Sequence, residues 1–240
     1  MRLGRILILA ALLLSTEIQN GCSAEVEKTE VKESEVAEVE KAYRANDSEQ
    51  ALAKGLPCAK KGNARCQYVV GEVYLIYKDN RSEAIKWYEK SVAQGYARSQ
   101  DKLARVILRN NPKRAFKLFQ LAANQGLSYS KHYLGKLYIS GEAGNKDLKK
   151  GFELIEEVAL TGDDWAQYDL GTLYQKGLGI HKDLVEAYKW YLIALWGSTG
   201  FDDQIGMDAE MAIMLLDREL SSEQIQEAKA RAKQFSKKKK

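Results

Sequence analysis

Residues 166–191 read AQYDLGTLYQKGLGIHKDLVEAYKWY, and this stretch decides the fold. Its first half places small, aliphatic, small and aromatic side chains at positions i, i+4, i+5 and i+8, which is one face of a helix: Ala166, Leu170, Gly171 and Tyr174. Its second half starts at an N-cap aspartate and carries a small residue and a large apolar pair: Asp183, Ala187 and Trp190-Tyr191. Gly177 and Gly179 separate the halves. The stretch therefore predicts a hairpin of two antiparallel helices.

Both patterns recur along the chain at a nearly fixed period. The first-helix pattern recurs as Cys66, Val70, Gly71 and Tyr74; Ser99, Leu103, Ala104 and Ile107; and Ser130, Leu134, Gly135 and Tyr138. The second-helix pattern recurs as N-caps Asn80, Asn111 and Asp147, pairs Trp87-Tyr88, Leu118-Phe119 and Leu154-Ile155, and terminal glycines Gly95, Gly126 and Gly162. Successive N-caps lie 31 to 36 residues apart, which is the signature of stacked repeats. We expect small residues to fill the seam within a hairpin and large pairs to fill the seam between hairpins.

A further, degenerate copy begins at Asp47. Lys54-Gly55 replaces its large pair, and Pro57 falls inside its second helix. Because proline removes a backbone donor and clashes with the preceding turn, we expect this unit to be frayed or remodelled.

These residues resemble Sel1-like repeats, the α/α relatives of tetratricopeptide repeats, from roughly residue 47 to 235. The resemblance rests on Leu-Gly-x-Leu-Tyr at 134–138 and 170–174, on the glycine-rich turn 177–183, and on the closing segment 220–229. It implies an all-α fold, an α/α solenoid of helix-turn-helix repeats with a C-terminal capping helix. It also implies that the array serves protein–protein interaction.

We expect five regions along the 240 residues. They are a signal peptide at 1–24, an acidic spacer or degenerate first helix at 25–46, the repeat array at 47–200, C-terminal capping helices at 201–236, and a basic tail at 237–240. Residues 25–50 hold nine acidic and four basic side chains. The formal net charge of +4 is therefore unevenly spread, and the array itself is modestly basic.

The N-terminus has the features of an export signal. Arg2 and Arg5 precede an apolar run, residues 6–14, that is too short to span a bilayer. Two processing routes remain open: cleavage after Ala24, or acylation of Cys22 as in a bacterial lipoprotein, which would tether the chain to a membrane. With the family resemblance, either route predicts the periplasm of a Gram-negative bacterium, as a soluble protein or an outer-membrane-anchored lipoprotein.

Both routes leave Cys58 and Cys66 as the remaining thiols, and an exported protein meets an oxidising environment. A short turn between antiparallel helices brings such positions within disulfide range. The alternative is that both are small buried apolar residues. Cysteine-rich Sel1 proteins carry pairs at the same separation, with both positions shifted by one, so the resemblance also implies a disulfide.

First helices line the groove of stacked hairpins. Positions −2, +1 and +5 from each Leu-Gly position share one helical face, namely Val69, Glu72, Ile76; Lys102, Arg105, Arg109; Tyr133, Lys136, Ser140; and Asp169, Thr172, Lys176. One interpretation is a mixed solvated face. The other is a groove that binds a partner with an acidic patch and a few apolar anchors.

No metalloprotease HExxH, nucleophile elbow, Walker loop or CxxC occurs in the sequence. The Gly-x-Gly at 177–179 follows no strand, so it predicts no nucleotide site. We expect His132 and His181 to be surface or hydrogen-bonded residues, Trp196 to be buried like the paired tryptophans, and no catalytic residue, metal or cofactor.

The predicted function is therefore a non-enzymatic protein-binding module of the cell envelope. The resemblance implies, more narrowly, an immunity protein that inhibits a toxic effector of type VI secretion, such as a phospholipase. The alternatives are an envelope scaffold or assembly factor and, more weakly, a hydrolase-like enzyme of the cysteine-rich Sel1 type. A nucleic-acid partner is not expected, and the lysines at 237–240 suggest at most a weak membrane attraction.

Overall fold

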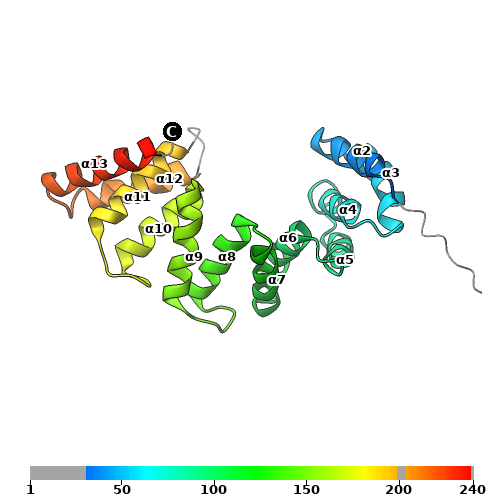
Figure 1. Ribbon diagram of the computed structural model, residues 1–240, viewed down its shortest axis with the longest axis horizontal. Helices are drawn as coiled ribbons and strands as arrows, with labels where there is room; N and C mark the ends of the chain where they lie inside the picture. The colour runs from blue at the N-terminus through cyan, green and yellow to red at the C-terminus, as the bar shows by residue number, and fades with distance from the viewer. Residues whose placement is uncertain (1–30, 199–203, 239–240) are drawn as a thin grey trace, which may run out of the picture.

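The computed structural model describes residues 31–198 and 204–238, which form twelve α-helices and no strand. The helices follow one another along a curved row from α2 to α13 (Figure 1). Their bounds are α2 Glu33–Arg44, α3 Ser48–Lys60, α4 Ala64–Ile76, α5 Arg81–Val92, α6 Ala97–Ile107, α7 Pro112–Asn124, α8 Ser128–Ser140, α9 Leu148–Thr161, α10 Asp164–Lys176, α11 Leu184–Gly197, α12 Gln204–Leu216 and α13 Ser222–Lys238. The predicted signal segment 1–24, with Cys22, lies outside the described residues.

Consecutive helices from α2 to α12 pack against each other, and they include the hairpins α4–α5, α6–α7, α8–α9 and α10–α11. The pair α2–α3 precedes these hairpins, and α12 and α13 both pack against α11. This arrangement confirms the all-α solenoid predicted from the repeat period.

The predicted N-caps all satisfy orphan backbone donors of the first helical turn. Asp183, for example, accepts hydrogen bonds from the backbone N–H groups of Val185 and Glu186. Side-chain oxygens cap the first turn of α3, α5, α7 and α9 in the same way, from Asp47, Asn80, Asn111 and Asp147. At the opposite helix ends, the predicted glycines have positive φ, as at Gly162 with 105°.

Small residues in the first helices allow close packing within each hairpin. A Cβ at Gly71 would lie 2.6 Å from the ring of Tyr88, and one at Gly171 would lie 2.8 Å from the ring of Tyr191. Tyr88 and Tyr191, the second members of their large pairs, thus lie over the small residue of their own hairpin. A second member can also fill the seam to the next hairpin, as Phe119 of α7 does by stacking on Tyr133 of α8. Trp190, the first member of the last pair, reaches the closing helix and packs on Phe235 of α13, with ring centroids 5.1 Å apart.

Three local predictions need correction. Pro57 does not interrupt α3, because its carbonyl still accepts from the backbone N–H of Lys61 and the helix runs to Lys60. Trp196 is 47% exposed and not part of the core, because it lies in the last turn of α11, beyond the buried positions, which end at Ala194. The first two residues of the predicted basic tail belong to the last helix, since α13 continues to Lys238.

Candidate functional site on the first-helix face

The surface formed by the side chains of α4, α6, α8 and α10 is named here the first-helix face. Among the residues predicted to line it, Ile76 is apolar and has 55% of its surface exposed to solvent. Arg109, Lys136, Ser140 and Lys176 are also exposed, and the half-buried members are Lys102, Arg105, Tyr133, Asp169 and Thr172. Most of the predicted set therefore reaches solvent at least in part.

Val69 and Glu72 do not line this face, so the prediction was wrong for both. Each is only 2% exposed, because α2 packs against α4 and covers the N-terminal end of the face. Val69 belongs to the same buried apolar cluster as Val36 and Val39 of α2. Of the two predictions for residues 25–46, an acidic spacer or a degenerate first helix, the described part agrees with a helix, and its packing on α4 shortens the available surface.

Glu72 is the centre of a buried polar network between four helices. Its carboxylate accepts hydrogen bonds from Tyr43 of α2 at 3.0 Å and Tyr88 of α5 at 2.5 Å. It also pairs with the Lys102 ammonium of α6 at 2.9 Å. Burial and the neighbouring Glu72 charge raise the pKa of Tyr88, so the tyrosine stays a hydrogen-bond donor across the physiological range. The network stabilises packing and leaves no group of Glu72 for a partner.

Several basic groups of the first-helix face are neutralised within the array. Besides Lys102, the Arg105 guanidinium lies 2.8 Å from Asp101, and the Lys136 ammonium lies 3.1 Å from Asp169. In the part of the chain that the structure describes, Arg109 and Lys176 have no such ion pair. These two cations therefore carry the charge that an acidic partner would meet.

Asp169 of α10 also binds His132 of α8, at 2.7 Å between Oδ2 and Nε2. Burial raises the pKa of Asp169, but the hydrogen bond from His132 and the charge of Lys136 outweigh burial and hold the pKa below its ordinary value. His132 is thus a buried, hydrogen-bonded link between two hairpins. This agrees with one of the two roles expected from the sequence.

Tyr133 is held rigidly in the middle of the face. Its ring stacks on Phe119 of α7 with centroids 5.0 Å apart and planes 2° from parallel. The Arg105 guanidinium lies 6.0 Å from the ring of Tyr133. A fixed aromatic beside a cation suits an interface anchor, because little side-chain entropy is lost when a partner binds.

Two adjoining pockets hollow the C-terminal part of the face. The pocket between α8 and α10, of about 230 Å³, is lined by Lys136, Ile139, Ser140, Ile155, Asp169, Thr172, Leu173, Lys176 and Leu178. The pocket between α10 and α12, of about 240 Å³, is lined by Tyr168, Thr172, Gln175, Lys176, Tyr191, Asp208, Met211, Ala212 and Leu215. Thr172 and Lys176 line both pockets.

The contribution of α12 was missed by the sequence reasoning, which assigned 201–236 to capping alone. The available signal was the amphipathic run at 204–216, where methionines recur outside the buried positions. In the structure, α12 follows α10 as one more helix along the same face and supplies one wall of the second pocket.

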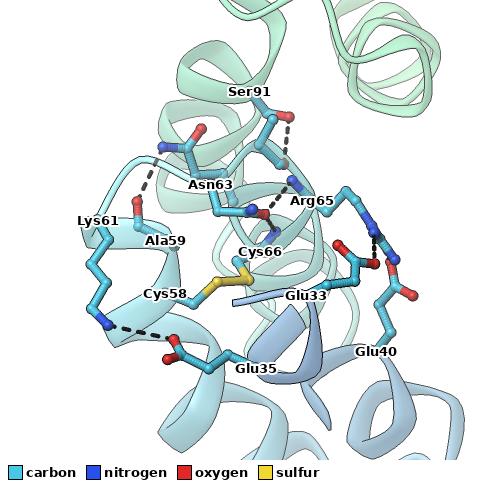
Figure 2. Close-up of a disulfide and its surroundings, with 12 residues drawn as sticks. Glu33, Glu35, Glu40, Cys58, Ala59, Lys61, Asn63, Arg65, Cys66 and Ser91 are labelled. Carbon is cyan, nitrogen blue, oxygen red and sulfur yellow. Dashed lines mark hydrogen bonds and ion pairs between the residues drawn. A yellow bond between two sulfur atoms is a disulfide. The ribbon is translucent and has the colours of Figure 1, made fainter. Parts of the chain in front are cut away.

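At the opposite end of the array, Cys58 and Cys66 form a disulfide with their Cα atoms 5.9 Å apart (Figure 2). It joins α3 to α4 across the turn that contains Asn63. The Asn63 side chain caps α4 by accepting from the backbone N–H groups of Arg65 and Cys66. Both cysteines are almost fully buried.

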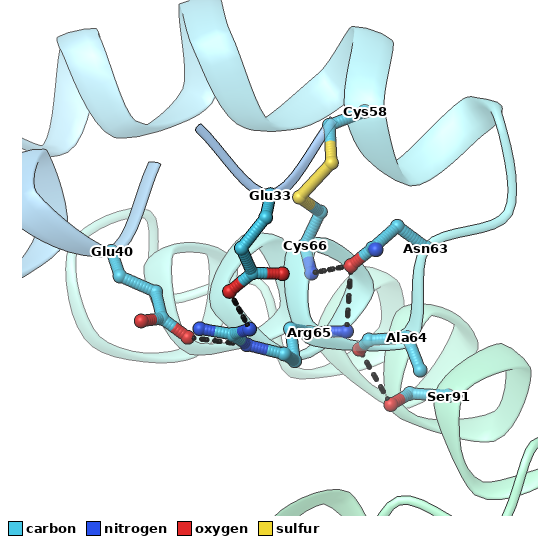
Figure 3. A network of polar contacts seen from close by, with 8 residues as sticks. All are labelled: Glu33, Glu40, Cys58, Asn63, Ala64, Arg65, Cys66 and Ser91. Atoms are coloured by element: carbon cyan, nitrogen blue, oxygen red, sulfur yellow. Dashed lines mark hydrogen bonds and ion pairs between the residues drawn. A yellow bond between two sulfur atoms is a disulfide. The ribbon is translucent and has the colours of Figure 1, made fainter. Parts of the chain in front are cut away.

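Acidic side chains of α2 bind the basic groups of this disulfide hairpin. Arg65 lies between Glu33 and Glu40 and pairs with both, at 2.9 Å to Glu40 (Figure 3). Lys61 pairs with Glu35 at 3.4 Å. The hydrogen bond with Arg65 holds the pKa of Glu40 below its ordinary value. The acidic helix α2 is therefore attached to the array by charge as well as by apolar contact.

Among the described residues, no group of three or more His, Cys, Asp or Glu is arranged to hold a metal ion. None of the described helices is both long enough and apolar enough to cross a bilayer.

The row of helix hairpins defines the chain as an α/α repeat solenoid. Its first-helix face is partly hollowed. Residues 64–96, 106–127, 128–159 and 166–195 each match the Sel1 repeat family model. The chain is a Sel1 repeat protein, and such repeats generally form non-enzymatic interaction scaffolds.

Known proteins share these repeats over part or most of their length. The sel1-like repeat-containing protein L21 of Acanthamoeba polyphaga mimivirus is 34% identical over 93 residues, which are 38% of this chain and 17% of L21. The structure of c5321, a protective antigen present in uropathogenic Escherichia coli strains that displays an SLR fold, matches with TM-score 0.70 and 27% identity, over 78% of this chain and 40% of c5321. A Sel1 repeat protein from Oxalobacter formigenes matches with TM-score 0.61 and 25% identity over 74% of each chain. The chain thus spans less than half the length of the first two.

Proposed function

We propose that this chain is a non-enzymatic binding module that holds a partner protein on its first-helix face. The observation that carries the proposal is the pair of adjoining pockets between α8, α10 and α12. Exposed Arg109 and Lys176 and the fixed ring of Tyr133 accompany them on the same face. Protein interfaces commonly combine apolar hollows, a few cations and rigid aromatic side chains.

The proposed site of action is the cell envelope of a Gram-negative bacterium, on the basis of the signal-like N-terminal sequence. Cys22 would carry the lipid if the chain is a lipoprotein. A Cys22→Ser variant then moves from the membrane fraction to the soluble fraction of the envelope, whereas simple cleavage after Ala24 leaves its distribution unchanged.

Binding is tested by co-purification of the tagged full chain from the envelope fraction of the bacterium that makes it. Tyr133 and Arg105 take part in packing, so the variants use exposed positions on either part of the face: Ile76→Ser/Arg109→Glu and Lys176→Glu/Met211→Ser. The matched control changes an exposed leucine and lysine of the second helix α7, Leu121→Ser/Lys117→Glu.

We expect at least one face variant to lose a partner that the α7 control retains, with the helical circular dichroism of all variants unchanged. Equal capture by both face variants and the control would contradict the proposal. A hydrolytic activity that survives in the absence of any partner would instead favour the hydrolase-like alternative.

A narrower proposal is that the partner is a toxic effector of type VI secretion, such as a phospholipase, which the chain neutralises. It rests on the resemblance to exported Sel1-like proteins. Co-expression decides it against the scaffold alternative: cells that produce an effector lipase encoded beside this chain should survive only when the chain is present. A neighbouring envelope-biosynthesis cluster, with no effect of the chain on toxicity, would favour the scaffold.

A further inference from the structure

We infer that the two pockets around Lys176 form one subsite for a partner segment in which an acidic side chain stands between aliphatic ones. This inference deepens the proposed function, on which it rests, by stating the chemistry of the segment that the face binds.

The first step is the position of Lys176. It lines the pocket between α8 and α10 as well as the pocket between α10 and α12, so it stands where the two meet. On the α8 side the walls include the apolar Ile139, Leu173 and Leu178. On the α12 side they include Met211 and Leu215. A cation thus lies between two hollows that can each take an aliphatic side chain.

The second step is the balance of charge around that cation. Lys136 and His132 already share the carboxylate of Asp169, as described above. Lys176 has no ion pair among the described residues, and Asp208, in the α12-side pocket, accepts a hydrogen bond from Gln204 of its own helix at 2.8 Å. The polar atoms of Thr172 and Gln175 are likewise engaged, since both bind the Tyr191 hydroxyl, at 3.1 and 2.7 Å. Charge complementarity therefore calls for a carboxylate from the partner, lying toward the α8 side and away from Asp208.

The third step is the apolar surface beyond the pocket. Met207, Met211, Met214 and Leu215 are 48%, 63%, 59% and 51% exposed, although the opposite side of α12 is fully packed. Their spacing of i, i+4, i+7 and i+8 places them along one side of the helix. Methionine is flexible and polarizable, so this surface can adapt to aliphatic side chains of differing shape.

The experiment uses the full chain and a set of fluorescent peptides in which one glutamate stands between two leucines at increasing separations. Binding is measured by fluorescence anisotropy at low salt, because exposed charges are screened as salt rises. A parallel set carries lysine in place of glutamate. The protein variants are Lys176→Glu, Asp208→Asn and the second-helix control Lys117→Glu.

We expect at least one glutamate peptide to bind saturably and its lysine counterpart to bind about tenfold more weakly. Lys176→Glu should reverse that preference, Asp208→Asn should strengthen binding of the glutamate peptide by removing a like charge, and Lys117→Glu should behave as the wild type. The inference is overturned if no peptide binds saturably, or if the charge preference survives in Lys176→Glu. If that happens while a first-helix-face variant still loses its partner in co-purification, only the subsite is wrong and the proposed function stands.

Discussion

Replacing Cys58 and Cys66 together by alanine removes the covalent link between α3 and α4. The two cysteines are 8 residues apart. For a closed loop of that size, the chain-entropy estimate gives about 2.5 kcal/mol of stabilisation relative to the reduced unfolded chain.

The loss should be local, because each unit of a solenoid contacts only its neighbours. Cys58 and Cys66 belong to a buried cluster that also holds Val36 and Val39 of α2. Arg65, next to Cys66, binds the acidic side chains of α2. We therefore expect α2, α3 and α4 to weaken together, while α10 and α11 keep their stability.

Hydrogen exchange followed by mass spectrometry resolves these segments. A loss of about 2.5 kcal/mol corresponds to about sixtyfold faster exchange of the protected amides in α3 and α4. Wild-type protein treated with a reductant should show the same pattern as the double variant, which separates the effect of the bond from that of the lost sulfur atoms. Unchanged exchange in α3 and α4, or an equal acceleration in α10 and α11, would refute the reasoning.

Two further substitutions test the packing and the charge of the array. Gly179→Ala should lower the free energy of unfolding by roughly 2 kcal/mol or more, because φ is +80° and the new Cβ would lie 2.2 Å from the carbonyl oxygen of Leu148. The matched control Gly144→Ala, with φ +83° and only the Lys113 side chain near the new Cβ, at 4.0 Å, should lose only about 1 kcal/mol; equal losses in urea unfolding would count against the steric argument. Asp169→Asn should cost about 1–3 kcal/mol at neutral pH by weakening the link to His132. Because the folded pKa of Asp169 is lowered, its contribution is fully present above the unfolded pKa of about 4 and is lost as the pH falls from there through the folded value. The difference in stability between the two proteins should therefore begin to shrink below about pH 4 and disappear once the pH is below the folded value; a difference that does not shrink in acid would contradict this.

The repeat architecture was predictable because it depends on local spacing. An N-cap such as Asp183 and a C-terminal glycine such as Gly162 mark helix ends through the chain's own backbone. The small residue of each first helix, such as Gly171, and the large pair of each second helix, such as Trp190-Tyr191, keep fixed offsets within their own helices, so the hairpin could be inferred before any contact was known.

The first-helix face was predicted only in part, because its boundaries depend on helices outside the repeat pattern. Helix α2 covers Val69 and Glu72, and its acidic sequence left open whether the segment is a spacer or a degenerate first helix. The ion pairs that neutralise Lys102 and Lys136 join helices roughly 30 residues apart in sequence, as in Lys102 with Glu72 and Lys136 with Asp169. The spacing of residues within one helix does not show which residues of another helix they pair with.

The central claim is that a protein partner lies on the first-helix face. It is tested most directly by photo-crosslinking in living cells, with a photoreactive amino acid placed singly at Arg109, Ser140 or Lys176 on that face and at Lys117 or Lys149 on the second helices. All five positions are exposed. We predict that the same partner is crosslinked from the first-helix positions and not from Lys117 or Lys149. Crosslinks that form only from the second helices, or equally from both sets, would contradict the claim.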